Sequence, residues 1–177
     1  MDLIWSSFCV CLVILSIKAF PFCCASRTGS PIFVTTGSTF FNFWVILSNI
    51  LLAILITHKH HDHIGGVEEL IINFPDVKIF GPENNEFRFK YKVLKEGDLI
   101  SILGTTIKFY IIETPGHTLD HIVYVDANNL FCGDTLFACG CGRLFEGTYN
   151  EMFHSLSKIS SLKPKTKIYC AHEYTKE

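Results

Sequence analysis

Thr57-His58-Lys59-His60-His61-Asp62-His63 contains the pattern H-x-H-x-D-H, which places three imidazoles and a carboxylate within six residues. It follows an unbroken apolar run, Ile50 to Ile56, and precedes two glycines. An apolar run that ends in polar residues is typical of a buried strand that presents side chains at its carboxyl end. Neutral imidazole and carboxylate are the ligands that zinc and similar metals prefer. The pattern H-x-H-x-D-H therefore indicates a metal site, and a His-rich polar loop is the alternative.

Length and composition indicate a folded protein with one domain. The 177 residues suffice for a hydrophobic core, and hydrophobic residues make up 49% against 18% charged residues. The net charge is −2 without a run of Lys or Arg, so we expect no nucleic-acid partner. Eight cysteines occur without a C-x-x-C pair, and their spacing predicts no disulfide scaffold.

Residues 1–49 form an atypical apolar segment, which we separate from a domain over residues 50–177. Phe8 to Ile17 is apolar or small throughout, which is short for a membrane span but normal for the core of a signal peptide. Asp2, with no Lys or Arg before the run, argues against a signal peptide. Several interpretations stay open for residues 3–25: a signal peptide, a membrane anchor, a buried strand or helix, or an atypical start joined to a domain.

Short strands and two amphipathic helices follow the ligand-rich stretch. Apolar residues at helical spacing predict helices over 66–74 and 150–162. Apolar runs bounded by turn residues predict strands over 77–80, 93–94, 99–103, 107–112, 122–125, 130–132 and 167–170. The fold class is therefore α/β (α+β).

Four of the predicted strands end at a candidate metal ligand. His58 and its neighbours follow the first, and His117, Asp134 and His172 follow three later ones. Ligands at the carboxyl ends of successive strands can converge on one edge of a sheet. The alternatives are turn or cap roles for His117 and Asp134 and a surface position for His172. These alternatives would have to hold for all three residues at once, so we interpret the residues at the strand ends as parts of one site.

The candidate ligands are too numerous for one tetrahedral zinc and suit two metals that share a carboxylate. They are His58, His60, Asp62, His63, His117, Asp134 and His172. His58 and His60 are two residues apart, so they point the same way on extended backbone. Two adjacent metals hold a bridging water as hydroxide near neutral pH, and one of them polarises the carbonyl under attack. No G-x-S-x-G motif for a serine nucleophile is present.

Four motifs in this order and spacing resemble the metallo-β-lactamase superfamily: T-H-K-H-H-D-H, T-P-G-H-T, G-D-T-L-F and A-H-E-Y-T. Within it, Gly133 to Thr148 closely resembles the glyoxalase II family, the hydroxyacylglutathione hydrolases. The resemblance runs from about Ala53 to Tyr174. It implies an αββα sandwich with two divalent metals, most often zinc, with iron and manganese as alternatives. It also implies hydrolysis of the thioester S-lactoylglutathione to glutathione and lactate.

The resemblance also assigns roles to residues. It places His58, His60 and His117 on the first metal, and Asp62, His63 and His172 on the second, with Asp134 bridging. Asp62, His63 and Asp134 are accordingly the expected catalytic residues. Arg143, Phe145 and Tyr174 occupy positions that contact the glutathione moiety. Phe145 stands where the family often has Tyr, and a solvated surface charge is the alternative for Arg143.

The chain departs from the family at both ends. Residues 1–49 lack the segments with which the family begins, so we expect a sandwich that is incomplete on the N-terminal side. The chain stops at Glu177, before the helical domain that binds glutathione in the family, so we expect weak activity with a raised KM. The alternatives are a small thioesterase or lactonase of the same fold, or an inactive truncated product that binds metal. A cytoplasmic monomer is the default expectation.

Overall fold

The computed structural model describes residues 12–16, 32–33, 51–172 and 174, with side chains from Leu51 onward. Most of the segment 1–49 lies outside the described residues, and its separation from residues 50–177 stays a prediction. Inside it, Leu12–Ser16 forms strand β1 and Ile32–Phe33 forms strand β2, which pair with each other in antiparallel fashion. Among the described residues, none of the helices has the length and apolar character needed to cross a membrane.

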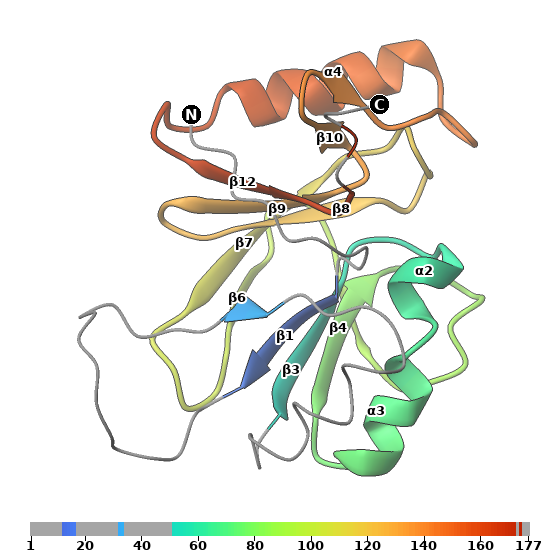
Figure 1. Ribbon diagram of the computed structural model, residues 1–177, viewed down its shortest axis with the longest axis vertical. Helices are drawn as coiled ribbons and strands as arrows, with labels where there is room; N and C mark the ends of the chain where they lie inside the picture. The colour runs from blue at the N-terminus through green and yellow to red at the C-terminus, as the bar shows by residue number, and fades with distance from the viewer. Residues whose placement is uncertain (1–11, 17–31, 34–50, 173, 175–177) are drawn as a thin grey trace.

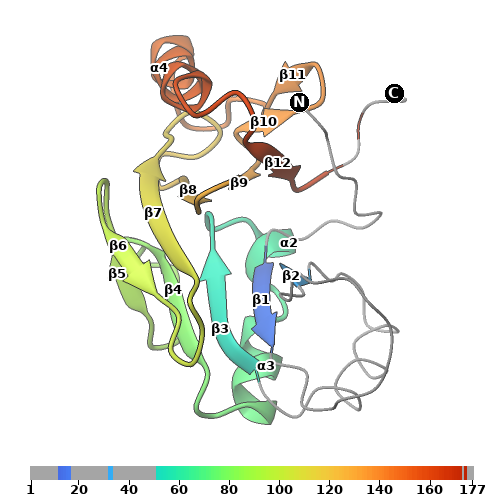
Figure 2. The same ribbon diagram turned by 90° about the vertical axis from the view of Figure 1, so that its left-hand side faces the viewer.

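Two five-stranded sheets make up the body of the molecule (Figures 1 and 2). The first has the order β2-β1-β3-β4-β5, in which β3 is Leu51–Ile56, β4 is Lys78–Pro82 and β5 is Lys92–Leu94. The second has the order β12-β9-β8-β7-β6, formed by Lys167–Cys170, Asn129–Gly133, Ile122–Val125, Lys108–Glu113 and Leu99–Ser101. The predicted strands are confirmed to within a few residues. A small hairpin of β10 (Leu136–Phe137) and β11 (Gly140–Cys141) was not predicted.

Each sheet is covered by a helix on its outer face, which gives the expected αββα layers (Figures 1 and 2). Helix α3, Val67–Asn73, packs on the first sheet through Val67 and Leu70. Helix α4, Tyr149–Ser160, packs on the second sheet through Ile159. It begins at a capping box, in which Thr148 Oγ1 accepts from the Glu151 N–H and the Glu151 side chain accepts from the Thr148 N–H.

Strand β3 is continuously apolar because both of its faces are buried. Ala53 and Leu55 belong to the cluster between the two sheets, with Phe109, Tyr124 and others. Ile54 and Ile56 belong to the cluster under helix α3. A strand with core on both sides reads as an uninterrupted apolar run rather than an alternating one, and burial of β3 therefore explains the run that precedes the histidines.

The functional edge lies where strands from both sheets end. β7, β9 and β12 run in the same direction, because β7 and β9 each pair antiparallel with β8 and β12 pairs parallel with β9. β3 belongs to the other sheet, so the expectation that the ligands meet on one edge of a single sheet is wrong. Hydrogen bonds join the sheets here: the Ile122 N–H donates to Thr57 O at 2.9 Å, and the Tyr124 hydroxyl donates to Ile56 O at 2.7 Å.

Candidate metal centre

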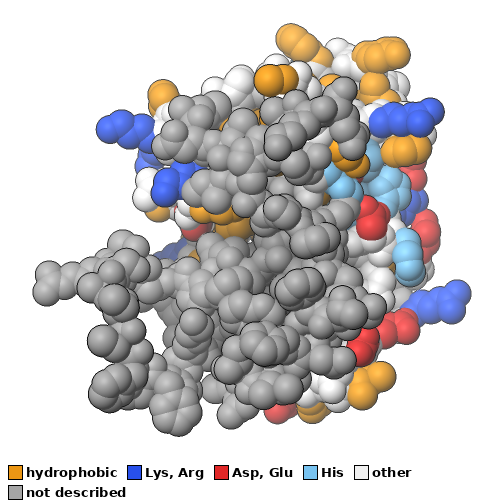
Figure 3. Space-filling view, in the orientation of Figure 1, with side chains coloured by type: hydrophobic (Ala, Val, Ile, Leu, Met, Phe, Trp, Pro, Cys, Tyr) orange, Lys and Arg blue, Asp and Glu red, His pale blue; other side chains and the backbone are white. Residues whose placement is uncertain are grey.

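The seven candidate ligands lie together at this edge, and Figure 3 shows the histidines gathered beside acidic side chains on one side of the molecule. Three groups have ligand atoms within 4.8 Å of one another: His58, His60 and His117; His58, His63 and Asp134; and Asp62, His63 and His172. The described residues outside these seven contribute to none of the groups. The structure thus brings every residue of the predicted ligand set into one cluster.

Three ring nitrogens converge in the first group. His58 Nε2 lies 3.0 Å and His117 Nε2 lies 2.9 Å from His60 Nδ1. His117 Nδ1 lies 2.7 Å from Arg143 O, and a carbonyl oxygen can only accept, so His117 carries its proton on Nδ1. In the neutral ring its Nε2 therefore presents a lone pair to the cluster. Convergent imidazole lone pairs are the arrangement that a zinc-type cation requires.

Asp134 lies between the groups. Its Oδ2 is 3.5 Å from His117 Nε2 and 3.4 Å from His172 Nε2, and its Oδ1 is 3.2 Å from His63 Nε2. Oδ1 is buried and accepts no hydrogen bond from the described residues. A buried carboxylate oxygen without a donor needs a cation to offset its desolvation, so the geometry fits a shared ligand of two metals.

The other acid of the cluster, Asp62, is about half exposed. Its Oδ2 lies 3.4 Å from both His63 Nε2 and His172 Nε2. A hydrogen bond from His63 lowers the pKa of Asp62, against the effect of partial burial. The carboxyl group is therefore ionised at neutral pH and available as a metal ligand.

Burial favours the neutral, metal-binding form of three of the histidines, His58, His117 and His172. Burial, assisted by the neighbouring His121, lowers the pKa of His58 far below its usual range. Burial also lowers the pKa of His117, although the charge of Asp134 opposes the shift, and it lowers the pKa of His172. Neutral imidazole is the coordinating species, so protons do not compete with a cation at neutral pH.

The stability of the metal-free protein should fall when the pH drops below about 6.5, the ordinary pKa of histidine. The folded state disfavours protonation of His58 and His121, whereas the unfolded chain takes up these protons freely. Each ring then contributes a slope of up to about 1.4 kcal/mol per pH unit, and no slope above that pH. Urea unfolding in EDTA at pH 7.5, 6.5 and 5.5 measures this effect. A constant free energy of unfolding across this range would contradict it.

The predicted substrate contacts line a pocket at the cluster. Its volume is about 520 Å³, and its lining includes Arg143, Phe145 and Tyr174 beside the candidate ligands. The Arg143 guanidinium lies 5.3 Å from the centre of the Phe145 ring. The Tyr174 ring stacks on His172 at 5.2 Å. All three residues are exposed, so they are accessible to a ligand.

Three residues beside the cluster were missed by sequence reasoning. Phe137, from the unpredicted hairpin, lines the pocket and contacts the ring of His172 at 5.9 Å. Lys59 pairs with Glu86 and Glu146, which joins the histidine-rich loop to the loop of Phe145. His121 is fully buried against His58. The only sequence signal for His121 was its place between the T-P-G-H-T motif and a strand.

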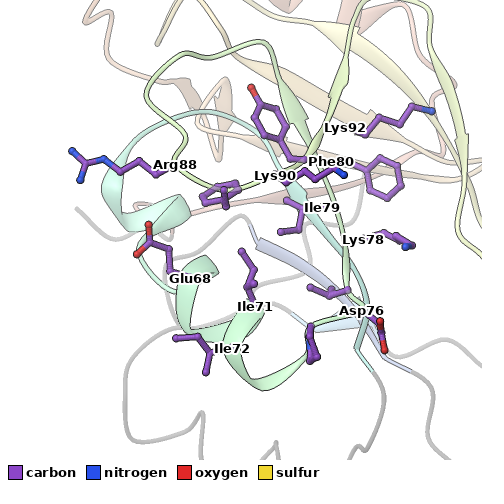
Figure 4. A pocket seen from close by; sticks show the side chains of 14 residues that line it. Glu68, Ile71, Ile72, Asp76, Lys78, Ile79, Phe80, Arg88, Lys90 and Lys92 are labelled. Carbon is purple, nitrogen blue, oxygen red and sulfur yellow. The ribbon is translucent and has the colours of Figure 1, made fainter.

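A second, larger groove lies away from the cluster (Figure 4). Helix α3 contributes Ile71 and Ile72, and strand β4 contributes Ile79 and Phe80, in a hollow of about 740 Å³. Its charged side chains, such as Arg88, are exposed. None of the three candidate metal-binding groups contributes a residue to this groove, so the candidate metal site lies in the smaller pocket.

The fold and the cluster agree with the family to which the sequence matches. Residues 51–172 match the metallo-beta-lactamase superfamily, and the chain belongs to it. Among solved structures, it is similar to ETHE1 from Myxococcus xanthus, with a TM-score of 0.62 and 28% identity, over 71% of this chain and 55% of that one. It is also similar to TTHA1623 in a di-iron-bound form, with a TM-score of 0.62 and 26% identity, over 76% of this chain and 75% of that one.

Curated relatives carry one shared name. The chain is 52% identical over 126 residues to a hydroxyacylglutathione hydrolase of Aliivibrio salmonicida, which covers 71% of this chain and 49% of that protein. It is 54% identical over 123 residues to a hydroxyacylglutathione hydrolase of Citrobacter koseri. This match covers 70% of this chain and 48% of that protein. The chain thus spans about half the length of these relatives.

Proposed function

We propose that this chain is a metal-dependent thioester hydrolase of the glyoxalase II type, which converts S-lactoylglutathione and water into glutathione and lactate. The observation that carries the proposal is the cluster of seven candidate ligands beside a pocket lined by Arg143. The 52–54% identity to hydroxyacylglutathione hydrolases supports the choice of substrate.

The proposed centre holds two divalent cations, with zinc as the first choice because its usual ligands are nitrogen and carboxylate. His58, His60 and His117 would hold one, Asp62, His63 and His172 the other, and Asp134 both. Bound cations supply a hydroxide nucleophile at neutral pH and polarise the thioester carbonyl. Iron is an alternative metal, because the similar protein TTHA1623 was solved in a di-iron-bound form. Manganese is a further alternative.

The chain's own side chains would bind and orient the thioester. The Arg143 guanidinium at the pocket is suited to a carboxylate of the glutathione moiety, since guanidinium and carboxylate form charge-assisted, often bidentate hydrogen bonds. Phe145 and Tyr174 offer flat apolar surfaces on which the substrate can lie. The pocket volume of about 520 Å³ falls in the range of small-molecule sites.

The zinc-loaded chain should hydrolyse S-lactoylglutathione. The reaction is measured as the loss of the thioester absorbance. A lactoyl thioester of a short thiol without carboxylates is the matched substrate. It should give a similar kcat but a KM higher by about 10-fold or more, because a hydrogen bond between charged groups contributes about 1.5–3 kcal/mol.

Other outcomes separate the alternatives. Equal KM for both thioesters would identify a small thioesterase, and turnover of a lactone instead would identify a lactonase. A chain that binds two metals and unfolds cooperatively but turns over none of these substrates would contradict the proposed enzyme. We propose a cytoplasmic location, because glutathione thioesters belong to a reducing compartment, and we keep a monomer as the default expectation.

A further inference from the structure

His121 is a fully buried histidine that belongs to none of the three candidate metal-binding groups. It directly precedes β8, and its ring lies under the cluster. The ring is stacked on that of His58, with centres 4.7 Å apart and an interplanar angle of 25°. Burial of an imidazole costs folding free energy unless both ring nitrogens are hydrogen-bonded. The hydrogen-bond partners of His121 therefore indicate its role.

Hydrogen bonds define the tautomer of His121. The Asp134 backbone N–H donates to His121 Nε2 at 3.1 Å, so this nitrogen holds a lone pair and the ring is neutral. The proton therefore sits on Nδ1, which lies 2.9 Å from Thr114 Oγ1 and 3.1 Å from Thr135 Oγ1. Both ring nitrogens are engaged, which leaves neither of them to bind a metal.

The turn that carries Asp134 is built around this ring. Gly133 has φ +51°, and a Cβ at that position would meet His121 Nε2 at 2.6 Å. Only a glycine allows the chain to pass this close with a left-handed conformation. His121 thus contacts one candidate ligand through its ring face, and through its edge it contacts the main chain of the candidate bridging ligand.

We propose that His121 is a positioning residue that holds the His58 ring and the Asp134 main chain in place, and so raises the affinity of both metal sites. The proposal rests on the two-metal centre of the proposed function. Groups that orient metal ligands through hydrogen bonds typically change metal affinity by about 10–100-fold when they are removed.

Two substitutions separate the hydrogen bond from mere packing. In H121Q, the side-chain oxygen can replace Nε2 as the acceptor for the Asp134 N–H, whereas in H121N the shorter amide replaces Nδ1 and leaves that N–H without an acceptor. Titration of zinc against a chromophoric chelator should show affinity reduced about 10–100-fold in H121N and within about 3-fold of the unsubstituted protein in H121Q. The cobalt-substituted proteins should show a changed visible spectrum in H121N alone. H154N, at an exposed histidine on α4, is the matched control.

Each outcome decides the proposal. Unchanged zinc affinity in H121N, or equal weakening in H121N and H121Q, would overturn it. If H121N does not unfold cooperatively, the double variant T114V/T135V serves in its place. It keeps His121 but removes both acceptors of Nδ1–H, and it should weaken zinc binding in the same way, with unchanged affinity again overturning the proposal. If the unsubstituted chain binds no metal, both proposals fail; if it binds two and the variants behave as expected without thioester turnover, only the proposed function fails.

Discussion

Replacing His60 by alanine should abolish thioester hydrolysis, with kcat/KM lowered by more than about 100-fold. His60 Nδ1 lies at the centre of the first group, 3.0 Å from His58 Nε2 and 2.9 Å from His117 Nε2. Substitution of groups that only orient metal ligands costs about 10–100-fold in affinity or activity, and loss of a ligand itself should cost more. Zinc content measured by atomic absorption should fall from two to about one per chain.

His61→Ala is the matched control for this substitution. His61 lies in the same tract and is exposed, but it belongs to none of the three metal-binding groups. We expect its zinc content to stay at that of the unsubstituted protein, because His61 supplies no ligand atom to these groups. His61 also lines the pocket, so the comparison of the two variants uses zinc content. Equal losses in both variants would show that the tract has no specific ligand at His60.

Replacing Gly142 by alanine should destabilise the fold by about 3 kcal/mol or more and disturb the metal centre. A Cβ at this position would collide with Asp134 O and lie 3.2 Å from His117 Nδ1. Adding a methyl group to a packed site costs about 1–3 kcal/mol when side chains can adjust. Here the obstacle is main chain, so Asp134 itself must move, and zinc affinity should fall together with the free energy of unfolding.

Gly140→Ala is the control, two residues earlier in the chain, in β11. A Cβ at Gly140 meets nothing within 4 Å, so the substitution adds a methyl group in open space. Urea unfolding and zinc titration of the two variants provide the comparison. If Gly142→Ala were as stable and bound zinc as tightly as Gly140→Ala, the close approach between Gly142 and the Asp134 main chain would not be a constraint in solution.

Most secondary structure could be predicted because the local signals agree with the tertiary fold. The run before His58 is apolar on both faces, and β3 is indeed buried on both. The helix at residues 150–162 has helical apolar spacing, and α4 carries a capping box at its start. The hairpin β10–β11 escaped prediction because its strands have two residues each, too few to show a period.

Other features have no local signal. Cys139 adopts φ +61° in the turn of that hairpin. A cysteine in a sequence does not predict this left-handed conformation, which is uncommon for residues other than glycine. The ion pairs of Lys59 have no local signal, because its partners Glu86 and Glu146 lie far along the chain. The role of His121 has no local signal, because its partners Asp134 and Thr135 come from the turn that follows β9.

By itself the sequence determined which residue types were present for metal chemistry and in what order they occur. Local backbone periodicity is encoded within a few neighbouring residues. It accounts for the ligand spacing in the H-x-H-x-D-H tract and for the predicted strand ends near His117, Asp134 and His172. Only the tertiary structure decided that β3 delivers its ligands from one sheet and β7, β9 and β12 deliver theirs from the other. It also decided that His121 supports the cluster, since the energy of a buried hydrogen bond depends on partners brought together by folding rather than by sequence.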